Sequence, residues 1–110
     1  MTRDLIDMAV FEELSDTMGP DFAAELVAAF LSDAGNMFAD LNRAIAEQDA
    51  DGYRRAAHSI KSNAQTFGAT PLAEQARAME LSGTIDGDAV GVLRTIFDET
   101  STVLKGLSNG

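Results

Sequence analysis

Apolar residues recur along most of this chain at steps of three and four positions, which is the spacing of one face of an α-helix. No segment shows the strict alternation of apolar and polar residues that is typical of a half-buried strand. We therefore expect an all-α protein. The pattern predicts five helices, over residues 4–16, from about 20 to about 48, from about 52 to 67, 70–83, and from about 88 to about 107.

The breaks between these segments contain residues that begin or end helices. Met18-Gly19-Pro20 separates the first two helices, and Pro20 suits the first turn of the second. Gly68 is expected to end the third helix in a left-handed conformation. The N-caps that we expect for the last three helices are Asp49 or Asp51, Thr70 (followed by Pro71), and Asp86 or Asp88.

Each predicted helix has one apolar stripe to bury, and the turns between the helices are short. Short turns between long amphipathic helices favour antiparallel neighbours. We expect one domain over residues 1–110, an antiparallel up-down four-helix bundle with an additional short N-terminal helix. The expected core positions are Leu5, Met8, Phe11, Leu14, Phe22, Leu26, Phe30, Met37 or Phe38, Leu41, Ile45, Tyr53, Ala56, Ala57, Ile60, Ala64, Phe67, Leu72, Ala76, Met79, Val92 or Leu93, Ile96, Phe97, Thr100, Val103, Leu104 and Leu107.

Composition narrows the possible functions. The formal net charge is −10, which argues against nucleic acid as a partner, because phosphate backbones are bound by clustered Lys and Arg. The chain has no cysteine and a single histidine, too few side chains for the usual zinc sites. It contains no apolar run suited to a signal peptide or a membrane span, so we expect a cytoplasmic protein, and a monomer.

The single histidine, His58, lies in the only long segment without an acidic residue. No Asp or Glu occurs from Gly52 to Ala73, although the chain has 18 of them. Arg54, Arg55 and Lys61, three of the eight basic residues, fall inside this window. The sequence therefore surrounds one imidazole with neutral and basic residues.

At helical spacing, His58, Lys61, Ser62 and Gln65 form a stripe opposite the apolar one, so the histidine is predicted to face solvent. Neutral imidazole is a nucleophile near pH 7, and neighbouring cations disfavour its protonated, unreactive form. A phosphoryl group in transfer carries negative charge that Lys can stabilise. The pattern favours a phosphoryl acceptor, although a lone histidine on an exposed helix face is more often an ordinary surface residue.

The run Ala57-His58-Ser59-Ile60-Lys61, with Gly68 ten residues after the histidine, resembles the histidine-containing phosphotransfer (HPt) domain family. The resemblance extends to Arg54-Arg55-Ala56-Ala57 before it and to Leu72-Ala73 and Ala76 after it. It implies the same helical bundle, with His58 phosphorylated and Lys61 beside the phosphoryl group. The family commonly has Gly after the Lys, where this chain has Ser62, so access to the imidazole is in question.

The resemblance implies a phosphorelay protein of two-component signal transduction. His58 would carry a phosphoryl group between aspartates of receiver domains, in response regulators or hybrid histidine kinases, or from a sensor kinase to a receiver. Lys61 would stabilise the phosphoryl oxygens and Gln65 would orient the group, with Arg54 or Arg55 adding a longer-range field. No cofactor is expected on this chain, since Mg²⁺ would belong to the receiver.

Two other functions remain open at this point. One is a bundle of the same fold that docks on a kinase or receiver without being phosphorylated, and the other is a generic helical adaptor. The adaptor leaves the acid-free window unexplained. We find no P-loop or glycine-rich nucleotide loop and no segment resembling a nucleophile elbow. The expected protein is thus a phosphoryl carrier more than an enzyme, without an ATP-binding kinase domain.

Overall fold

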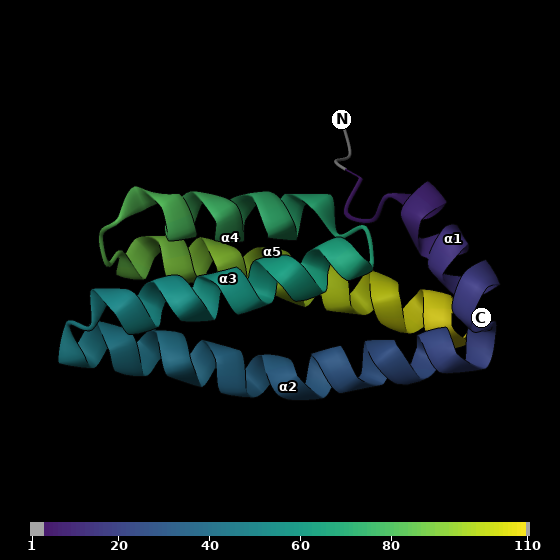
Figure 1. Cartoon of the computed structure of the whole chain (residues 1–110), viewed down its shortest axis with the longest axis horizontal. Coiled ribbons are helices and arrows are strands. Elements are labelled where there is room, and N and C mark those ends of the chain that lie inside the picture. The colour runs from purple at the N-terminus through teal and green to yellow at the C-terminus, as the bar shows by residue number, and fades with distance from the viewer. Residues whose placement is uncertain (1–3, 110) are drawn as a thin grey trace.

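The computed structural model describes residues 4–109, and every regular element in this range is an α-helix. The helices are α1 (Met8–Met18), α2 (Pro20–Glu47), α3 (Ala50–Thr66), α4 (Thr70–Ser82) and α5 (Gly87–Asn109). Helices α2 to α5 run alternately in opposite directions, and α1 crosses one end of the bundle (Figure 1). The predicted fold, an up-down four-helix bundle with a short N-terminal helix, is confirmed.

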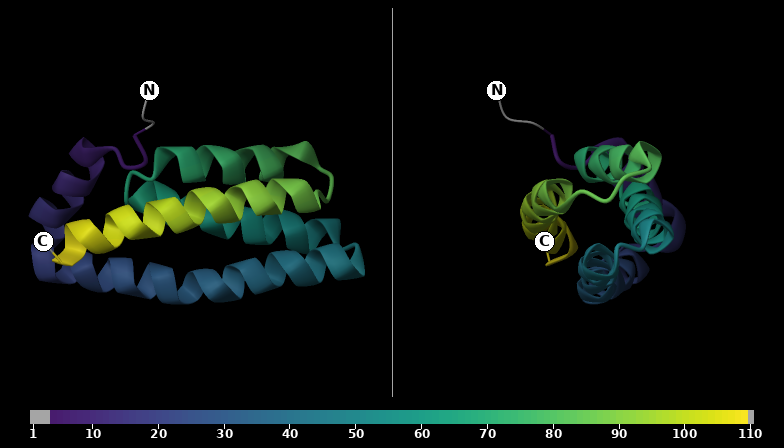
Figure 2. Two further views of the ribbon diagram at one scale, coloured as in Figure 1. Left: turned by 180° about the vertical axis from the view of Figure 1, so that it is seen from behind. Right: turned by 90° about the vertical axis from the view of Figure 1, so that its left-hand side faces the viewer.

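Seen along its axis, the bundle is a ring of four helices around one core (Figure 2). Each of α2–α5 packs against two neighbours, α3 between α2 and α4, and α5 between α4 and α2. Four phenylalanines meet in the centre, with Phe30 stacked on Phe67 at 5.5 Å and in edge contact with Phe97 at 5.9 Å between ring centroids. Phe38 completes the group. The apolar stripes read from the sequence therefore do form a single core.

The predicted helix boundaries are correct where glycine and proline dictate them. Gly19 has φ +90° and separates α1 from α2, with Pro20 at the first position of α2. Helix α3 ends in a Schellman motif, in which the Ala69 amide donates to the Ala64 carbonyl at 2.9 Å and the Gly68 amide to the Gln65 carbonyl at 3.1 Å. Gly68 has φ +70°, as the sequence predicted.

Two predicted N-caps are decided and a third is wrong. The Asp49 carboxylate accepts from the Gly52 amide at 3.0 Å, and Asp86 accepts from the Asp88 amide at 2.9 Å, so Asp49 and Asp86 are the caps. Thr70 does not cap α4. It is already helical, and its hydroxyl donates to the Gly68 carbonyl at 3.3 Å, because the Schellman turn brings the chain back into helix directly after Ala69.

The N-terminal helix begins later than predicted, at Met8 instead of Asp4. Asp7 caps it by accepting from the Ala9 amide at 3.1 Å, and the Asp7 amide donates to the Gly68 carbonyl at 2.7 Å. Asp7 consequently attaches the start of α1 to the α3–α4 turn. Residue Met8 is exposed, while Phe11 is buried as expected.

One aromatic position assigned to the core, Phe22, is misplaced by the simple stripe, and one open alternative is decided. Phe22 is exposed, since the neighbouring Ala23 takes the inward position in the first turn of α2. On α5 the alternative between Val92 and Leu93 is decided for Leu93, which is fully buried, and Val92 is half-exposed.

Candidate functional site

His58 lies in the middle of α3 on the side opposite the core. Tyr53, Ala57 and Ile60 bury the inner face of the helix, and the His58 side chain retains 55% of its accessible surface. The Tyr53 hydroxyl also donates to the Asp86 carbonyl at 3.2 Å, which fastens the start of α3 to the loop before α5. The imidazole is thus presented to solvent by a rigid helix, as the sequence predicted.

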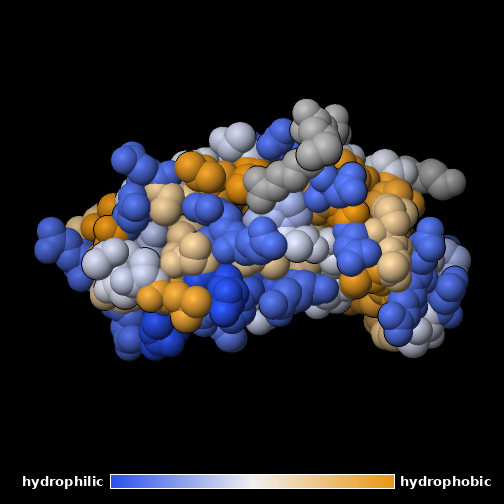
Figure 3. Space-filling view, turned by 90° about the horizontal axis from the view of Figure 1, so that it is seen from above, coloured by the Kyte–Doolittle hydropathy of each residue, from blue (hydrophilic) through white to orange (hydrophobic). Residues whose placement is uncertain are grey.

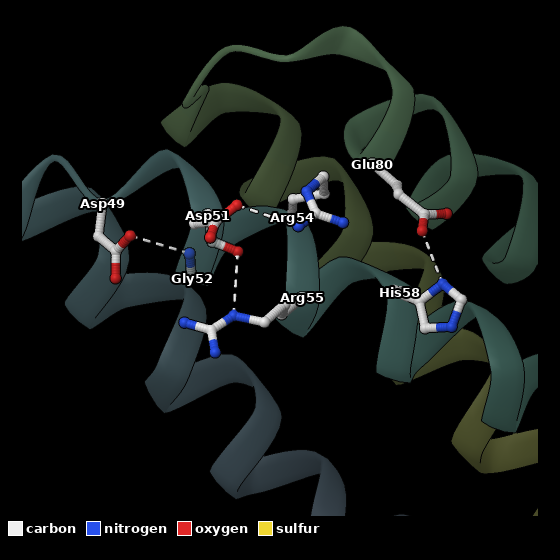
Figure 4. A network of polar contacts seen from close by, with 7 residues as sticks. All are labelled: Asp49, Asp51, Gly52, Arg54, Arg55, His58 and Glu80. Atoms are coloured by element: carbon white, nitrogen blue, oxygen red, sulfur yellow. Dashed lines mark hydrogen bonds and ion pairs between the residues drawn. The ribbon is translucent and has the colours of Figure 1, made fainter.

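A carboxylate from another helix contacts both expected site residues. Glu80, near the end of α4, lies with one oxygen 2.6 Å from His58 Nδ1 and the other 2.6 Å from Lys61 Nζ. Figure 4 shows Glu80 reaching down from α4 to the ring of His58. The expectation that acidic groups are absent around the histidine is therefore wrong, since the acid-free window holds only along the sequence.

The contact with Glu80 fixes the roles of the two ring nitrogens. A carboxylate can only accept a hydrogen bond, so Nδ1 carries the proton in this pair and donates it to Glu80. In the neutral ring the lone pair then resides on Nε2. Nε2, the nitrogen with the free lone pair, lies on the side of the ring away from Glu80 (Figure 4).

Lys61 and Glu80 form the most shielded ion pair of the described residues. Their side chains retain 19% and 14% of their accessible surface. The hydrogen bond from Lys61 lowers the pKa of Glu80 below its ordinary value, with a further lowering from the His58 hydrogen bond, and partial desolvation opposes both. Glu80 is therefore ionised at neutral pH and acceptor-only, which supports the protonation of Nδ1.

The two arginines one turn before His58 both contact Asp51 of their own helix, Arg54 through its carboxylate and Arg55 through its backbone carbonyl. The Arg54 guanidinium lies 3.0 Å from the Asp51 carboxylate, and Arg55 Nε donates to the Asp51 carbonyl at 3.4 Å (Figure 4). Arg54 holds the pKa of Asp51 below its ordinary value. The positive field expected from this side of His58 is consequently reduced by Asp51, which stands just outside the acid-free window.

The structure places the remaining predicted site residues on the same exposed face of α3. Ser62, one turn after His58, is exposed, and its backbone carbonyl accepts from the Thr66 hydroxyl at 3.2 Å. Gln65 lies one turn beyond Lys61, where it lines a groove together with Arg77 of α4. His58 and Lys61 are thus held together by one carboxylate, whereas Gln65 lies two helical turns from the imidazole.

Glu80 is the site residue that sequence reasoning missed. A signal was present, because α3 and α4 form an antiparallel pair around the turn at Gly68 and Ala69. His58 and Glu80 are each eleven residues from Ala69, so the hairpin brings them level. Locating the turn first would have directed attention to this glutamate.

No cluster of three or more His, Asp or Glu side chains within residues 4–109 is arranged to hold a metal ion. In the same range no helix has the length and apolar character needed to cross a membrane.

A four-helix bundle that offers solvent one imidazole, oriented through its other nitrogen by a carboxylate, has the features of a helical phosphoryl carrier. The family model of the Hpt domain matches residues 25–103, and the chain belongs to this family. The family's role is phosphotransfer in phosphorelays, and its partners are receiver domains and kinases.

One solved structure has the same fold across nearly the whole chain. It is the histidine-containing phosphotransfer protein B (HptB) from Pseudomonas aeruginosa PAO1, which is 22% identical in sequence with a TM-score of 0.91. The match covers 98% of this chain and 97% of that one. No curated protein sequence matches significantly.

Proposed function

We propose that His58 is the phosphoryl acceptor of this Hpt domain and that Nε2 is the nitrogen that reacts. The observation that carries the proposal is the 2.6 Å contact of Nδ1 with Glu80 on a ring that remains largely exposed. Glu80 orients the ring, selects the tautomer with a free lone pair on Nε2, and places a negative charge beside the ring.

The reaction is a direct exchange of one bond to phosphorus for another. The Nε2 lone pair attacks the phosphorus of a receiver's aspartyl phosphate, the bond between phosphorus and the carboxyl oxygen breaks, and the aspartate leaves as a carboxylate. The product is a phosphorylated imidazolium whose Nδ1–H remains on Glu80, so the carboxylate stabilises the positive ring. Transfer to another receiver is the same step in reverse.

Lys61 supplies charge to the transferring group in this proposal. An ammonium has three N–H donors, and Glu80 occupies one of them, which leaves donors for the phosphoryl oxygens. Arg54 and Arg55 add a weaker, longer-range field. Gln65 would orient the phosphoryl group through hydrogen bonds, and Ser62 would border the space that the receiver enters.

We expect the chain to be a monomeric cytoplasmic carrier. Its partners would be receiver domains of response regulators or hybrid kinases, and its formal charge of −10 argues against nucleic acid. Mg²⁺ would be held by the receiver, and the carrier itself requires no cofactor in this scheme.

The experiment is transfer of radioactive phosphate from receivers phosphorylated with acetyl phosphate. The wild-type chain should gain an acid-labile, base-stable phosphohistidine, and His58→Gln should gain none while its helical circular dichroism is unchanged. Label on the His58→Gln variant would refute the assignment. A folded wild-type chain that binds receivers without gaining label would instead be a docking module.

Glu80→Gln tests the role of the carboxylate. The amide can donate to or accept from Nδ1 and no longer selects one tautomer, so we expect transfer to slow by about tenfold or more. Glu99→Gln, the same change at an exposed position of α5, is the matched control. Nitrogen-15 NMR of the ring should show an Nδ1–H tautomer in the wild type and the control, and a mixture in Glu80→Gln.

A further inference from the structure

The two ring nitrogens of His58 are turned toward different flanks of α3. Helix α3 packs between α4 and α2, and Glu80 of α4 lies 2.6 Å from Nδ1. The N–H and the lone pair of a neutral imidazole point to nearly opposite sides of the ring. Nε2 is therefore turned away from α4 (Figure 4), toward the flank of α3 that borders α2.

The cations one turn from His58 are divided between the same two flanks. With 3.6 residues per turn, positions i−3 and i+4 lie to one side of a residue, and positions i−4 and i+3 lie to the other. Arg55 is at i−3, whereas Arg54 and Lys61 are at i−4 and i+3. The contacts agree, because Lys61 reaches Glu80 of α4 and Arg55 lines a groove of about 300 Å³ between α3 and α2.

Both cations that α3 places on the α4 flank are bound to carboxylates. Lys61 Nζ lies 2.6 Å from Glu80, and the Arg54 guanidinium lies 3.0 Å from the Asp51 carboxylate. Figure 3 views the molecule from the α4 side and shows apolar residues lying among the hydrophilic ones there. This flank therefore offers a phosphoryl group interrupted polar surface and cations that are already shared with acids.

Arg55 has hydrogen-bond donors to spare on the flank where Nε2 points. Its Nε donates to the Asp51 backbone carbonyl at 3.4 Å, and it forms no ion pair with any residue in the range 4–109. The exposed guanidinium is directed toward the start of α3 (Figure 4), so it can turn toward His58 without breaking a buried contact. Arg77 of α4 is also without an ion pair in this range, but it lies on the Nδ1 side.

We infer that Arg55 binds the phosphoryl group on Nε2 of His58 from the α2 side, while Lys61 approaches it from the α4 side. The inference rests on the proposed function and turns the distant field of one arginine into a direct contact. Arg55 precedes His58 by roughly 4.5 Å of helix rise, a distance that its long side chain spans. The guanidinium fork suits two phosphoryl oxygens, which carry the charge during transfer. Arg55 takes no part in the bonds that form or break.

The carboxylates of the α2–α3 groove leave this contact possible. Asp49, the N-cap of α3, precedes His58 by roughly 13 Å of helix rise, and Glu47 lies beside it at the end of α2. Asp40 is paired with Arg43, which offsets its charge. The acids therefore disfavour a phosphoryl group deep in the groove and leave it at the end that His58 borders.

The test compares Arg55→Gln with Arg54→Gln, the same change at two adjacent exposed positions. Each variant is phosphorylated by a receiver and by phosphoramidate, a small donor that needs no docking and passes its phosphoryl group to Nε2 as ammonia leaves. Arg55→Gln should slow both reactions about tenfold, whereas Arg54→Gln, which removes a distant charge, should slow them about twofold. Arg77→Gln should stay within twofold of the wild type.

Two further measurements separate a direct contact from a structural role. Arg55→Lys should recover part of the rate, because it keeps the charge and loses the fork. In phosphorus-31 NMR of the phosphorylated chain, the pH at which the phosphoryl oxygens take up a proton should rise in Arg55→Gln and stay unchanged in Arg77→Gln, because a bound cation favours the ionised form. Circular dichroism should show the same helix content in all variants.

Three outcomes would decide against the contact or against the function beneath it. Equal slowing in Arg55→Gln and Arg54→Gln would leave both arginines as distant charges and overturn the inference. Slowing of Arg55→Gln with the receiver alone would make Arg55 a contact to the partner protein and overturn it as well. If phosphoramidate labels the wild type and no receiver does, the proposed function fails, while the phosphoramidate series still decides whether Arg55 binds the group.

Discussion

Gly68 offers the most direct test of how the α3–α4 turn holds the site and the N-terminal helix together. A Cβ added at Gly68 would lie 2.8 Å from the Asp7 carbonyl oxygen and 2.8 Å from Val10 Cβ, and the backbone has φ +70°. Gly83 ends α4 with φ +73°, but a Cβ there would have nothing within 4 Å. Gly68→Ala and Gly83→Ala therefore create the same backbone strain, but only in Gly68→Ala does the new Cβ also collide with residues next to and within α1.

The expected losses of stability follow from these distances. The left-handed conformation costs an alanine about 1–2 kcal/mol, and that is the whole effect expected for Gly83→Ala. In Gly68→Ala the overlap adds about 1–3 kcal/mol, because one of the close atoms is a backbone oxygen that cannot rotate away. If α1 moves away to relieve this overlap, the hydrogen bond from the Asp7 amide to the Gly68 carbonyl breaks, which lowers the stability by a further ~1 kcal/mol.

We therefore expect Gly68→Ala to be less stable than Gly83→Ala by about 2–4 kcal/mol in urea unfolding followed by circular dichroism. At about 4 °C per kcal/mol for a domain of this size, the difference in Tm is roughly 8–16 °C. Hydrogen exchange should show that amides of α1 lose protection in Gly68→Ala and keep it in Gly83→Ala. Equal losses in the two variants would refute the claim that α1 packs against this turn.

Three further predictions concern the site. Lys61→Ala should slow phosphotransfer by roughly one to two orders of magnitude and lose the stability that its pair with Glu80 contributes. Lys61→Arg should recover much of the rate. Wild-type kinetics in Lys61→Ala would show that its charge is not used. Ser62→Gln should sharply lower the rate of phosphotransfer from a receiver, measured as label reaching His58, whereas Ser62→Gly should keep or raise this rate. Equal rates for Gln and Ser at position 62 would contradict the claim that Ser62 borders the space the receiver enters. Because the pKa of Glu80 is lowered in the folded protein, its contacts stabilise the protein at pH values above the ordinary carboxyl range, and this contribution is lost as pH falls through the folded pKa. Carbon-13 NMR should find that Glu80 titrates below the ordinary value of 4.5, and that its pKa rises in Lys61→Ala. An unshifted titration of Glu80 would rule out its pair with Lys61 in solution.

The sequence by itself determined the helices, because helix formation depends on residues three and four positions apart and on local punctuation. The long helix α2 is predicted almost to the residue, since Gly19-Pro20 begins it and its apolar stripe is continuous up to Ile45. The exposed position of His58 follows in the same way. Both results need only the periodicity of one helix.

Errors occurred where a contact with another element decides the local structure. Helix α1 begins at Met8, because the Asp7 amide is used by the Gly68 carbonyl more than sixty residues away. Thr70 became helical because the Schellman turn places Ala69 in the core. The bond between Asp7 and Gly68 is not encoded within a short window of sequence, and the burial of Ala69 depends on the helices that pack over it.

The carboxylate beside His58 was placed there by tertiary structure. The stretch from Gly52 to Ala73 has no acid, yet the antiparallel packing of α4 on α3 places Glu80 against both His58 and Lys61. Charges act through space over a few ångströms, and residues 22 positions apart come within hydrogen-bonding distance once the turn at Gly68 and Ala69 sets the register. The sequence thus determines which residue faces solvent, and the register of two packed helices determines which of its nitrogens is hydrogen-bonded to Glu80.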